Sequence, residues 1–345
     1  VKNMSILPFE CDYMEGCHPL ILNRLNEINF EKISGYGCDE ICKSAKEKIR
    51  VACDCPNAEI HFLVGGTQTN ATVIDALLKR YETVITANTG HITEHEAGAI
   101  EAKGHKVTML PSHEGKISCD DLLAFLKNYF DDENNAHIVR PGVVYISFPT
   151  EFGTIYSLDE LKSLRKVCDE YNLKLYLDGA RLGYGISASS DVTLKDIAKY
   201  CHAFYIGGTK VGAMFGEAVV FTEENLVPHF FTLIKQNGAL LAKGWLLGVQ
   251  FDTLFTDDLY FKISDNAIKM AKRIEQAFVQ KGYKIFIDSP TNQKFIVLEN
   301  SKMQELKKSV SFSYWQKFDE NHTVVRFATS WATTDEQVDE LLRLI

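Results

Sequence analysis

The segment Leu173-Lys174-Leu175-Tyr176-Leu177-Asp178-Gly179-Ala180-Arg181 is an apolar run followed at once by a carboxylate, a glycine and an arginine. The run from Leu173 to Leu177 is typical of a buried strand, and Asp178 marks the place where that strand ends. A second run, Ala203 to Ile206, comes after a predicted helix over 194–200, and Thr209-Lys210 follows it. This strand–helix–strand order indicates two neighbouring parallel strands, with Asp178 and Lys210 at their ends.

The same alternation extends on both sides of this segment, from about residue 58 to residue 222. Short apolar runs that fit strands alternate with longer amphipathic stretches that fit helices, and the helix predicted over 157–171 begins with a capping box of Ser157 and Glu160. Further strands are expected at 60–64, 83–86, 106–110 and 143–148, and further helices from the turn at 65–67 to residue 80, at 94–103 and at 118–129. This order predicts an α/β fold with a mostly parallel sheet between layers of helices.

The pattern changes after about residue 223. Two helical stretches, at about 224–255 and 258–281, precede two strand-like runs at 295–298 and 323–328, and a last helix starts near Asp335. We therefore expect a large domain over 13–240 and a small C-terminal α+β domain over 241–345, which residues 1–12 join.

Length, charge and cysteine content exclude several classes of protein. With 345 residues, 46% of them hydrophobic, the chain can bury a large core without disulfides. Its 37 Lys and Arg against 46 Asp and Glu give a net charge of −9, which argues against nucleic acid as a partner, and no apolar run fits a membrane span. Nine cysteines without a paired C-x-x-C spacing indicate reduced thiols, and Val1-Lys2-Asn3-Met4 lacks a signal-peptide core, so we expect a cytoplasmic protein.

Three groups of residues follow predicted strands, and Glu151 follows a fourth, which is where ligands bind in open α/β sheets. Gly65-Gly66-Thr67 stands at a helix start, which is either an anion site or an ordinary tight turn. Asp178 ends a buried strand and needs a partner there, for which a salt bridge to Arg181 is the simplest structural explanation. Lys210 is either an ordinary surface lysine or a desolvated amine suited to Schiff-base chemistry.

Together these groups match the needs of one cofactor. Pyridoxal phosphate requires a helix N-terminus for its phosphate, a carboxylate for its pyridine nitrogen and a lysine for its aldehyde. Gly65-Gly66-Thr67, Asp178 and Lys210 can supply all three. The sequence holds no Walker A loop and no G-x-G-x-x-G string after a strand, so a nucleotide is less well supported.

Seven motifs occur in an order that matches a known family: Cys11-Asp12, Tyr36-Gly37-Cys38-Asp39, Gly65-Gly66-Thr67-Gln68-Thr69-Asn70, His91 with Glu96-Ala97-Gly98, Leu177-Asp178-Gly179-Ala180-Arg181, Thr209-Lys210 and Val325-Arg326-Phe327. Over nearly its whole length the chain resembles the threonine aldolases, which are fold-type I pyridoxal-phosphate enzymes often grouped as β-eliminating lyases. The resemblance implies a carbon–carbon lyase of the low-specificity L-threonine aldolase type, which cleaves β-hydroxy-α-amino acids to glycine and an aldehyde.

The resemblance also implies which residues bind the cofactor. Lys210 would join it as a Schiff base, Asp178 would keep the pyridine nitrogen protonated, and His91 would stack on the ring. The phosphate would be bound by Gly66, Thr67, Thr209 and, from a neighbouring subunit, Lys243.

Other residues are implied to meet the substrate. Arg181, which also borders the cofactor, and Arg326 would hold the carboxylate of the amino acid, because a forked guanidinium matches that group. Tyr36, in a glycine-flanked loop, would contact the active site, with core packing as the alternative. The resemblance further implies a homodimer or homotetramer with shared active sites.

Two motifs depart from the commoner threonine aldolase pattern. Cys11 stands where many members have a serine that touches the substrate carboxylate, so Cys11 is expected to border the substrate. Thr150-Glu151-Phe152-Gly153 stands where many have a histidine that meets the β-hydroxyl. This version resembles the phenylserine aldolase branch and makes Glu151 a candidate for the substrate hydroxyl, against a solvated loop carboxylate. The base itself stays open between Glu151, His91 and a bound water.

Two other functions remain as alternatives. The same cofactor and fold could support another β-eliminating lyase, because the cofactor alone does not determine which Cα bond breaks. More remotely, His91-Ile92-Thr93-Glu94-His95 has the H-x-x-E-H spacing of inverted zinc hydrolases. That spacing requires both histidines on one helix face, whereas His91 is expected before the helix or in its first turn, so we predict no metal.

Overall fold

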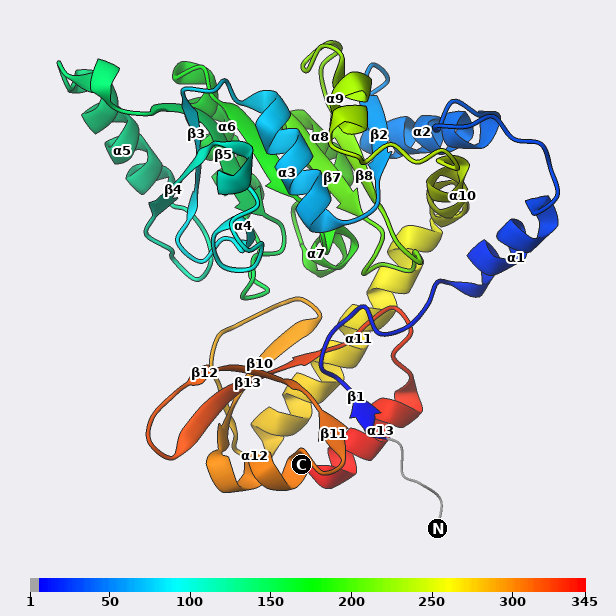
Figure 1. Cartoon of the computed structure of the whole chain (residues 1–345). Helices are drawn as coiled ribbons and strands as arrows, with labels where there is room; N and C mark the ends of the chain where they lie inside the picture. The colour runs from blue at the N-terminus through cyan, green and yellow to red at the C-terminus, as the bar shows by residue number, and fades with distance from the viewer. Residues whose placement is uncertain (1–5) are drawn as a thin grey trace.

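The computed structural model describes residues 6–345, so Val1 to Met4, on which the signal-peptide prediction depends, lie outside the described residues. Its larger part contains a seven-stranded sheet with the strand order β2-β8-β7-β6-β5-β3-β4 (Figure 1). The strands are β2 (Glu59–Leu63), β3 (Glu82–Ala87), β4 (Lys106–Leu110), β5 (Arg140–Ser147), β6 (Lys174–Asp178), β7 (Ala203–Gly207) and β8 (Glu217–Phe221). Only the pairs formed by β8 are antiparallel, so the predicted α/β fold with a mostly parallel sheet is confirmed.

Helices cover both faces of this sheet because its strands alternate apolar residues between two hydrophobic clusters. On β5, Val144 packs into one cluster, whereas Val143 and Tyr145 pack into the other. The first cluster holds residues of α2 (Glu40–Cys53), α5 (Cys119–Asp131), α6 (Leu158–Glu170), α8 (Leu194–Tyr200) and α10 (Trp245–Leu254), and the second those of α3 (Gly66–Leu77) and α9 (Phe230–Gln236). Within residues 6–345 no helix has both the length and the apolar character that a membrane span requires.

The smaller part lies beside one end of the sheet and is reached along the long helix α11 (Leu259–Gln280) (Figure 1). Its four-stranded antiparallel sheet has the order β12-β13-β10-β9. Its elements are β9 (Lys284–Ile285), β10 (Gln293–Glu299), α12 (Asn300–Leu306), β11 (Val310–Ser311), β12 (Ser313–Lys317), β13 (His322–Ala328) and α13 (Asp335–Leu344). Near the N-terminus, β1 (Leu7–Pro8) pairs with β11, and α1 (Pro19–Ile28) follows. The division at residue 240 stays a prediction, although α10, which lies beyond it, packs on the larger part.

Two of the predicted helices differ from the structure. The stretch 94–103 is not one helix but the short turns α4 (His91–Glu94) and η1 (Glu101–Lys103), because Ala97 and Gly98 adopt positive φ angles of 51° and 73° that a helix cannot include. The stretch 224–255 is likewise divided into α9 and α10, with Gly238 at φ 65° just after α9. The capping box at Ser157 and Glu160 is confirmed.

Candidate active site

A cavity of about 270 Å³ lies at the ends of β2, β6 and β7. Asp178 is the last residue of β6, Lys210 follows β7, and α3 begins at Gly66 just after β2. All three line this cavity. The sheet therefore brings together the three groups that the sequence singled out.

Asp178 is a buried anion that faces the cavity, with 4% of its surface exposed. Its carboxylate accepts hydrogen bonds from the Tyr205 hydroxyl at 2.5 Å, the Tyr145 hydroxyl at 2.6 Å and the Asn70 amide at 2.9 Å. Burial on its own would raise the pKa of Asp178, but the charge of His91 and these hydrogen bonds outweigh it and lower that pKa. Asp178 is consequently ionised at neutral pH.

Lys210 presents a half-buried amine to the same cavity. Its Nζ lies 5.7 Å from the centre of the Tyr13 ring, and within residues 6–345 it donates no hydrogen bond. Its backbone carbonyl accepts a hydrogen bond from the Tyr184 hydroxyl at 2.6 Å, which fixes the loop. Burial and the charge of Arg181 lower the pKa of Lys210, which increases the fraction of neutral, nucleophilic amine.

The N-terminus of α3 opens onto the cavity. Gly65 precedes the helix without a capping side chain, so the first backbone N–H groups of α3 are available to an anion. A Cβ on Gly66 would lie only 3.3 Å from the Tyr205 hydroxyl, which favours glycine there. Thr67 and Thr209 line the cavity as well.

His91 is the first residue of α4, as predicted, and its ring lies against a buried carboxylate. Its Nδ1 is 2.9 Å from Oε1 of Glu96, which also accepts a hydrogen bond from the Asn70 amide at 2.8 Å. Burial would lower the pKa of His91, but the hydrogen bond to Glu96 and the charges of Asp178 and Glu96 raise it. Asn70 bonds both carboxylates, so one polar network holds His91 and Asp178 in place.

Glu151 lies in the loop after β5 and lines both the first cavity and a second one. Its Oε1 accepts hydrogen bonds from the Ser147 hydroxyl at 2.8 Å and from the backbone N–H of His91 at 3.0 Å. Burial raises the pKa of Glu151, although the bond from Ser147 opposes this. Because Glu151 is half-buried and hydrogen-bonded, it is not the solvated loop carboxylate of the alternative interpretation.

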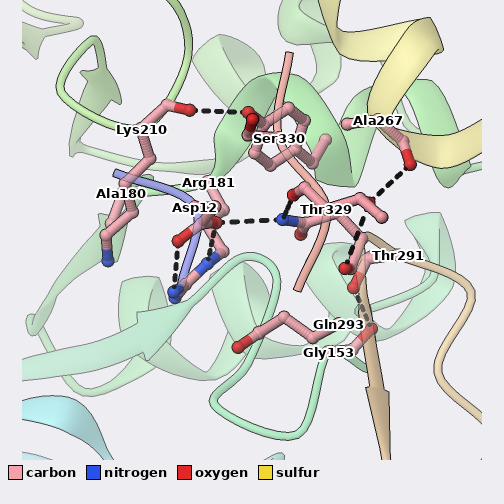
Figure 2. A network of polar contacts seen from close by, with 12 residues as sticks. Asp12, Gly153, Ala180, Arg181, Lys210, Ala267, Thr291, Gln293, Thr329 and Ser330 are labelled. Atoms are coloured by element: carbon pink, nitrogen blue, oxygen red, sulfur yellow. Dashed lines mark hydrogen bonds and ion pairs between the residues drawn. The ribbon is translucent and has the colours of Figure 1, made fainter. Parts of the chain in front are cut away.

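Arg181 forms its ion pair with Asp12, so the alternative explanation of Asp178 as a salt-bridge partner of Arg181 is wrong. Figure 2 shows both nitrogens of the guanidinium edge on the Asp12 carboxylate, with Nε to Oδ2 at 2.6 Å and Nη2 to Oδ1 at 2.9 Å. Asn292 donates a further hydrogen bond to Asp12 at 2.9 Å. Despite complete burial, which raises it, the pKa of Asp12 is lowered to about 2 by the charges of Arg181 and Lys210.

Arg326 lines the second cavity, of about 460 Å³, together with Lys210, Arg181 and Glu151. Its Nη1 donates to the Gln293 side chain at 2.9 Å, its Nη2 donates to the Ser313 hydroxyl at 3.1 Å, and its guanidinium carbon is 5.7 Å from the centre of the Trp315 ring. In the described part of the chain no carboxylate forms an ion pair with Arg326. Unlike the charge of Arg181, that of Arg326 is not balanced by a carboxylate at ion-pair distance within residues 6–345.

Three predicted residues lie outside these two cavities. Cys11 is half-buried and lines neither, whereas the adjacent Asp12 holds Arg181. Tyr36 lines a separate cavity of about 90 Å³, and its backbone N–H donates to Ala242 at 3.0 Å. Lys243 is exposed beside that contact. The roles of Cys11, Tyr36 and Lys243 therefore stay predictions.

The H-x-x-E-H string does not form a set of zinc ligands. The helix that carries it, α4, ends at Glu94, and His95 is exposed with its ring centre 5.5 Å from that of His91. The one cluster within residues 6–345 whose donor atoms lie within 4.8 Å of one another contains His91, Glu96 and Asp178, and so neither Glu94 nor His95.

Sequence reasoning missed the residues that support Asp178. The sequence patterns did not single out Tyr145 or Tyr205, although a tyrosine in each of three neighbouring strands of the sheet, at 145, 176 and 205, was a usable signal. Tyr145 and Tyr176 are indeed direct neighbours in the β5–β6 register. Glu217, which lines the first cavity from the start of β8, was also missed, because the sequence patterns did not predict that strand.

Comparison with known proteins adds to this geometry. A family model described as beta-eliminating lyase matches residues 21–301. A low specificity L-threonine aldolase from Pseudomonas aeruginosa is 28% identical, covering 97% of this chain and 96% of the relative. A solved Leishmania major threonine aldolase superposes with a TM-score of 0.94 at 39% identity, covering 98% of both chains. At 15% identity, a histidinol-phosphate aminotransferase from Clostridium acetobutylicum shares only the fold, with a TM-score of 0.74 over 98% of both chains.

Proposed function

Because the chain belongs to the β-eliminating lyase family, we propose that it is a pyridoxal-phosphate-dependent aldolase, which cleaves β-hydroxy-α-amino acids to glycine and an aldehyde. The family resemblance in the sequence is confirmed, and so is the fold-type I architecture that threonine aldolases share with aminotransferases. Carbon–carbon lyase chemistry is thus the activity that this family membership supports.

One observation carries the cofactor proposal: a reactive lysine, an ionised buried carboxylate and an open helix N-terminus meet at one cavity. Asp178 has three side-chain hydrogen-bond donors but, within residues 6–345, no cation at ion-pair distance. A protonated pyridine nitrogen would supply that cation. The residues present therefore fit pyridoxal phosphate.

Each of these residues has a defined task toward the cofactor. When bound, pyridoxal phosphate supplies an aldehyde for the substrate amine and a ring that withdraws electrons from Cα. Lys210 would attach it and return a proton to Cα, while Asp178 would hold a proton at the ring nitrogen. His91 would cover the ring face, and Gly66, Thr67, Thr209 and the N–H groups of α3 would hold the phosphate.

Toward the substrate, the chain contributes two guanidinium groups and a base. Arg326 binds the carboxylate with its unbalanced charge, and Arg181, already paired with Asp12, adds directional N–H donors. Glu151 takes the β-hydroxyl proton as the carbon–carbon bond breaks, because it borders both cavities and its pKa is raised. We assign this step to Glu151 rather than His91, because the hydrogen bond and charge of Glu96 raise the pKa of His91 against the effect of burial and so favour its protonated form, which cannot accept a proton.

A specific observation supports a phenylserine-type substrate as a second candidate. Tyr314 and Trp315 line the second cavity next to Arg326, and Phe152 contacts Trp315 with its ring centre 5.5 Å away. An aromatic wall of this kind favours a large apolar side chain on Cβ over the methyl group of threonine.

We extend the proposal to assembly and location. Tyr36 and Lys243 lie on one exposed pair of loops outside the single-chain site, which agrees with a homodimer or homotetramer in which they serve a neighbouring active site. All nine cysteines are free and five are buried, as in proteins of a reducing compartment, which supports a cytoplasmic location.

Product analysis tests the proposal directly. The purified protein should bind pyridoxal phosphate and release glycine from L-threonine, L-allo-threonine or L-phenylserine, with the ratio of rates separating the threonine and phenylserine types. Lys210→Ala should abolish release, whereas Lys199→Ala, a change at an exposed lysine, should not. Formation of ammonia and a 2-oxo acid (2-oxobutanoate from the threonines, phenylpyruvate from phenylserine) instead of glycine and aldehyde would identify a different β-eliminating lyase.

A further inference from the structure

Glu217 is a buried carboxylate to which the proposed reaction gives no role. It is the first residue of β8, is 3% exposed and lines the same cavity as Lys210. In the sheet it lies between Leu63 at the end of β2 and Gly207 at the end of β7. The chain that leaves β2 forms the N-terminus of α3, and the chain that leaves β7 carries Thr209. An acidic group thus sits between the two elements assigned to an anionic phosphate.

The hydrogen bonds of Glu217 control the hydroxyl of Thr209. Oε1 of Glu217 is 2.8 Å from Thr209 Oγ1, and Oε2 accepts the backbone N–H of Gly208 at 3.0 Å. Thr209 Oγ1 also accepts the backbone N–H of Gly216 at 3.0 Å. A hydroxyl has one proton and two lone pairs. With Glu217 ionised, Thr209 gives its only proton to that carboxylate and offers the cavity nothing but a lone pair.

Protonation of Glu217 reverses this arrangement. The carboxyl group then donates to Thr209 Oγ1, both lone pairs of the hydroxyl are occupied, and its proton is free to point into the cavity. A phosphate monoester above pH 7 presents only acceptor oxygens, so it gains a hydrogen bond from the second arrangement and is repelled by the first.

We propose that Glu217 is a positioning residue that must hold a proton for the Thr209 hydroxyl to donate to the cofactor phosphate. The inference rests on the proposed function, since it takes the bound anion to be the phosphate of pyridoxal phosphate.

The surroundings of Glu217 favour the protonated form. Lys210 is the nearby cation, Asp178 on β6 is a nearby anion, and β2 places the apolar Leu63 opposite. The tyrosines close enough to feel the charge of Glu217 are Tyr176 of β6, Tyr205 of β7 and Tyr260 of α11. Their hydroxyls donate to Asn70, Asp178 and the Gly207 carbonyl instead. Burial raises the pKa of Glu217 to about 8, against the opposing effect of its hydrogen bonds and of Lys210.

The test compares pyridoxal phosphate with pyridoxal, which has the same aldehyde but no phosphate. The advantage of pyridoxal phosphate is the dissociation constant of pyridoxal divided by that of pyridoxal phosphate. This ratio isolates the contribution of the phosphate, because reaction with Lys210 is common to both. In the natural chain the advantage of pyridoxal phosphate should fall about tenfold from pH 7 to pH 9, as a carboxyl group with a pKa of about 8 ionises. In Glu217→Gln, whose amide donates to Thr209 at every pH, the advantage should not change with pH.

Substitutions of Thr209 provide a second and independent measurement. Thr209→Val should reduce the advantage of pyridoxal phosphate and remove its pH dependence, whereas Thr209→Ser, which keeps the hydroxyl, should retain both. The inference would be overturned if the advantage of pyridoxal phosphate also fell tenfold from pH 7 to pH 9 in Glu217→Gln. Should Glu217→Gln not fold, the same fall in Thr209→Val would overturn it. Failure of the natural chain to bind either aldehyde at any pH would instead refute the proposed function.

Discussion

At the scale of single residues, the site is organised by which buried charges are balanced. Asp178 is stabilised by neutral donors, and Arg181 is balanced by Asp12, which leaves Arg326 with an unmatched positive charge at the second cavity. A chain with a net charge of −9 therefore still has a local site for a carboxylate. Net charge describes the surface as a whole and not the ligand.

Asp12→Asn tests the balance at Arg181. Asp12 is fully buried and its pKa is lowered from 3.8 to about 2, so its charge contributes about 2 kcal/mol of stability at neutral pH. We expect the variant to lose roughly 2–3 kcal/mol of unfolding free energy in urea at pH 7. A carboxylate whose pKa is lowered by folding stabilises the folded state at every pH above its pKa in the unfolded chain. The loss of unfolding free energy in Asp12→Asn should therefore be the same at pH 5 and at all higher pH values. It should shrink between about pH 4 and pH 2, because Asp12 of the natural chain takes up a proton in the unfolded state at a higher pH than in the folded state, where its pKa is about 2.

The control for this variant is Glu10→Gln, which removes an exposed carboxylate from the same segment. Its unfolding free energy should stay within about 0.5 kcal/mol of the natural chain. If the two variants have equal stability, Asp12 does not balance Arg181.

Tyr145→Phe tests whether the donors of Asp178 matter for catalysis. The Tyr145 hydroxyl donates to Asp178 at 2.6 Å, whereas the equally buried Tyr176 hydroxyl donates to Asn70 at 2.9 Å. Loss of a hydrogen bond to a charged group costs about 1.5 kcal/mol, so we expect about a tenfold lower kcat for glycine release in Tyr145→Phe. Tyr176→Phe should reduce kcat far less, and equal losses in the two variants would contradict the assignment.

The sequence predicted some of these residues and not others for a physical reason. Asp178 and Lys210 stand at strand ends, where a charge interrupts an apolar run and is visible in one dimension. Tyr145 and Tyr205 bond Asp178 from neighbouring strands, and Glu217 bonds Thr209 beside Lys210. All of these contacts depend on the sheet register. Register cannot be read from a single apolar run, because several pairings bury it equally well.

At the scale of elements, the close approach of the loops after β6 and β7 sets the distance between Asp178 and Lys210. The Gly207 N–H donates to the Gly179 carbonyl at 2.9 Å. A Cβ on Gly179 would lie 1.9 Å from the Tyr205 carbonyl oxygen, so the two strand ends could not remain where they are.

Gly179→Ala should accordingly destabilise the protein and its site together. We expect a loss of about 2–3 kcal/mol of unfolding free energy, as for other overpacked positions, and weaker binding of pyridoxal phosphate. Gly65→Ala is the control for stability, because no atom lies within 4 Å of its Cβ position and its φ of −171° suits any residue. Thermal denaturation monitored by circular dichroism would show the difference, and similar melting temperatures would contradict it.

Several helices and strands lie where the sequence patterns predicted them. The helix at 194–200 matches α8, and the strand at 106–110 matches β4. The stretch 94–103 failed because its helical composition is overridden at Ala97 and Gly98, where positive φ angles turn Glu96 toward His91. The polar network of the site outweighs local helix propensity there.

At the scale of the whole molecule, the N-terminal segment holds the two parts together around the second cavity. Phe9 accepts a backbone hydrogen bond from Ala328 at 2.9 Å, the Glu10 carbonyl accepts one from Arg326 at 3.2 Å, and Asp12 binds Arg181 of the larger part. Substrate groups bound at Arg326 are thus held by a different part of the molecule from those bound near Lys210.

Arg326→Gln should separate substrate binding from cofactor binding for this reason. A charge-assisted hydrogen bond contributes about 1.5–3 kcal/mol, so we expect KM for the amino acid to rise about 10- to 100-fold. The dissociation constant for pyridoxal phosphate should stay within about threefold, because Arg326 does not line the first cavity. Arg343→Gln, at an exposed arginine that pairs with Glu340, serves as the control and should leave both constants unchanged. An unchanged KM in Arg326→Gln would mean that the carboxylate is bound elsewhere, and a matching rise in the cofactor dissociation constant would mean that the two parts do not act separately.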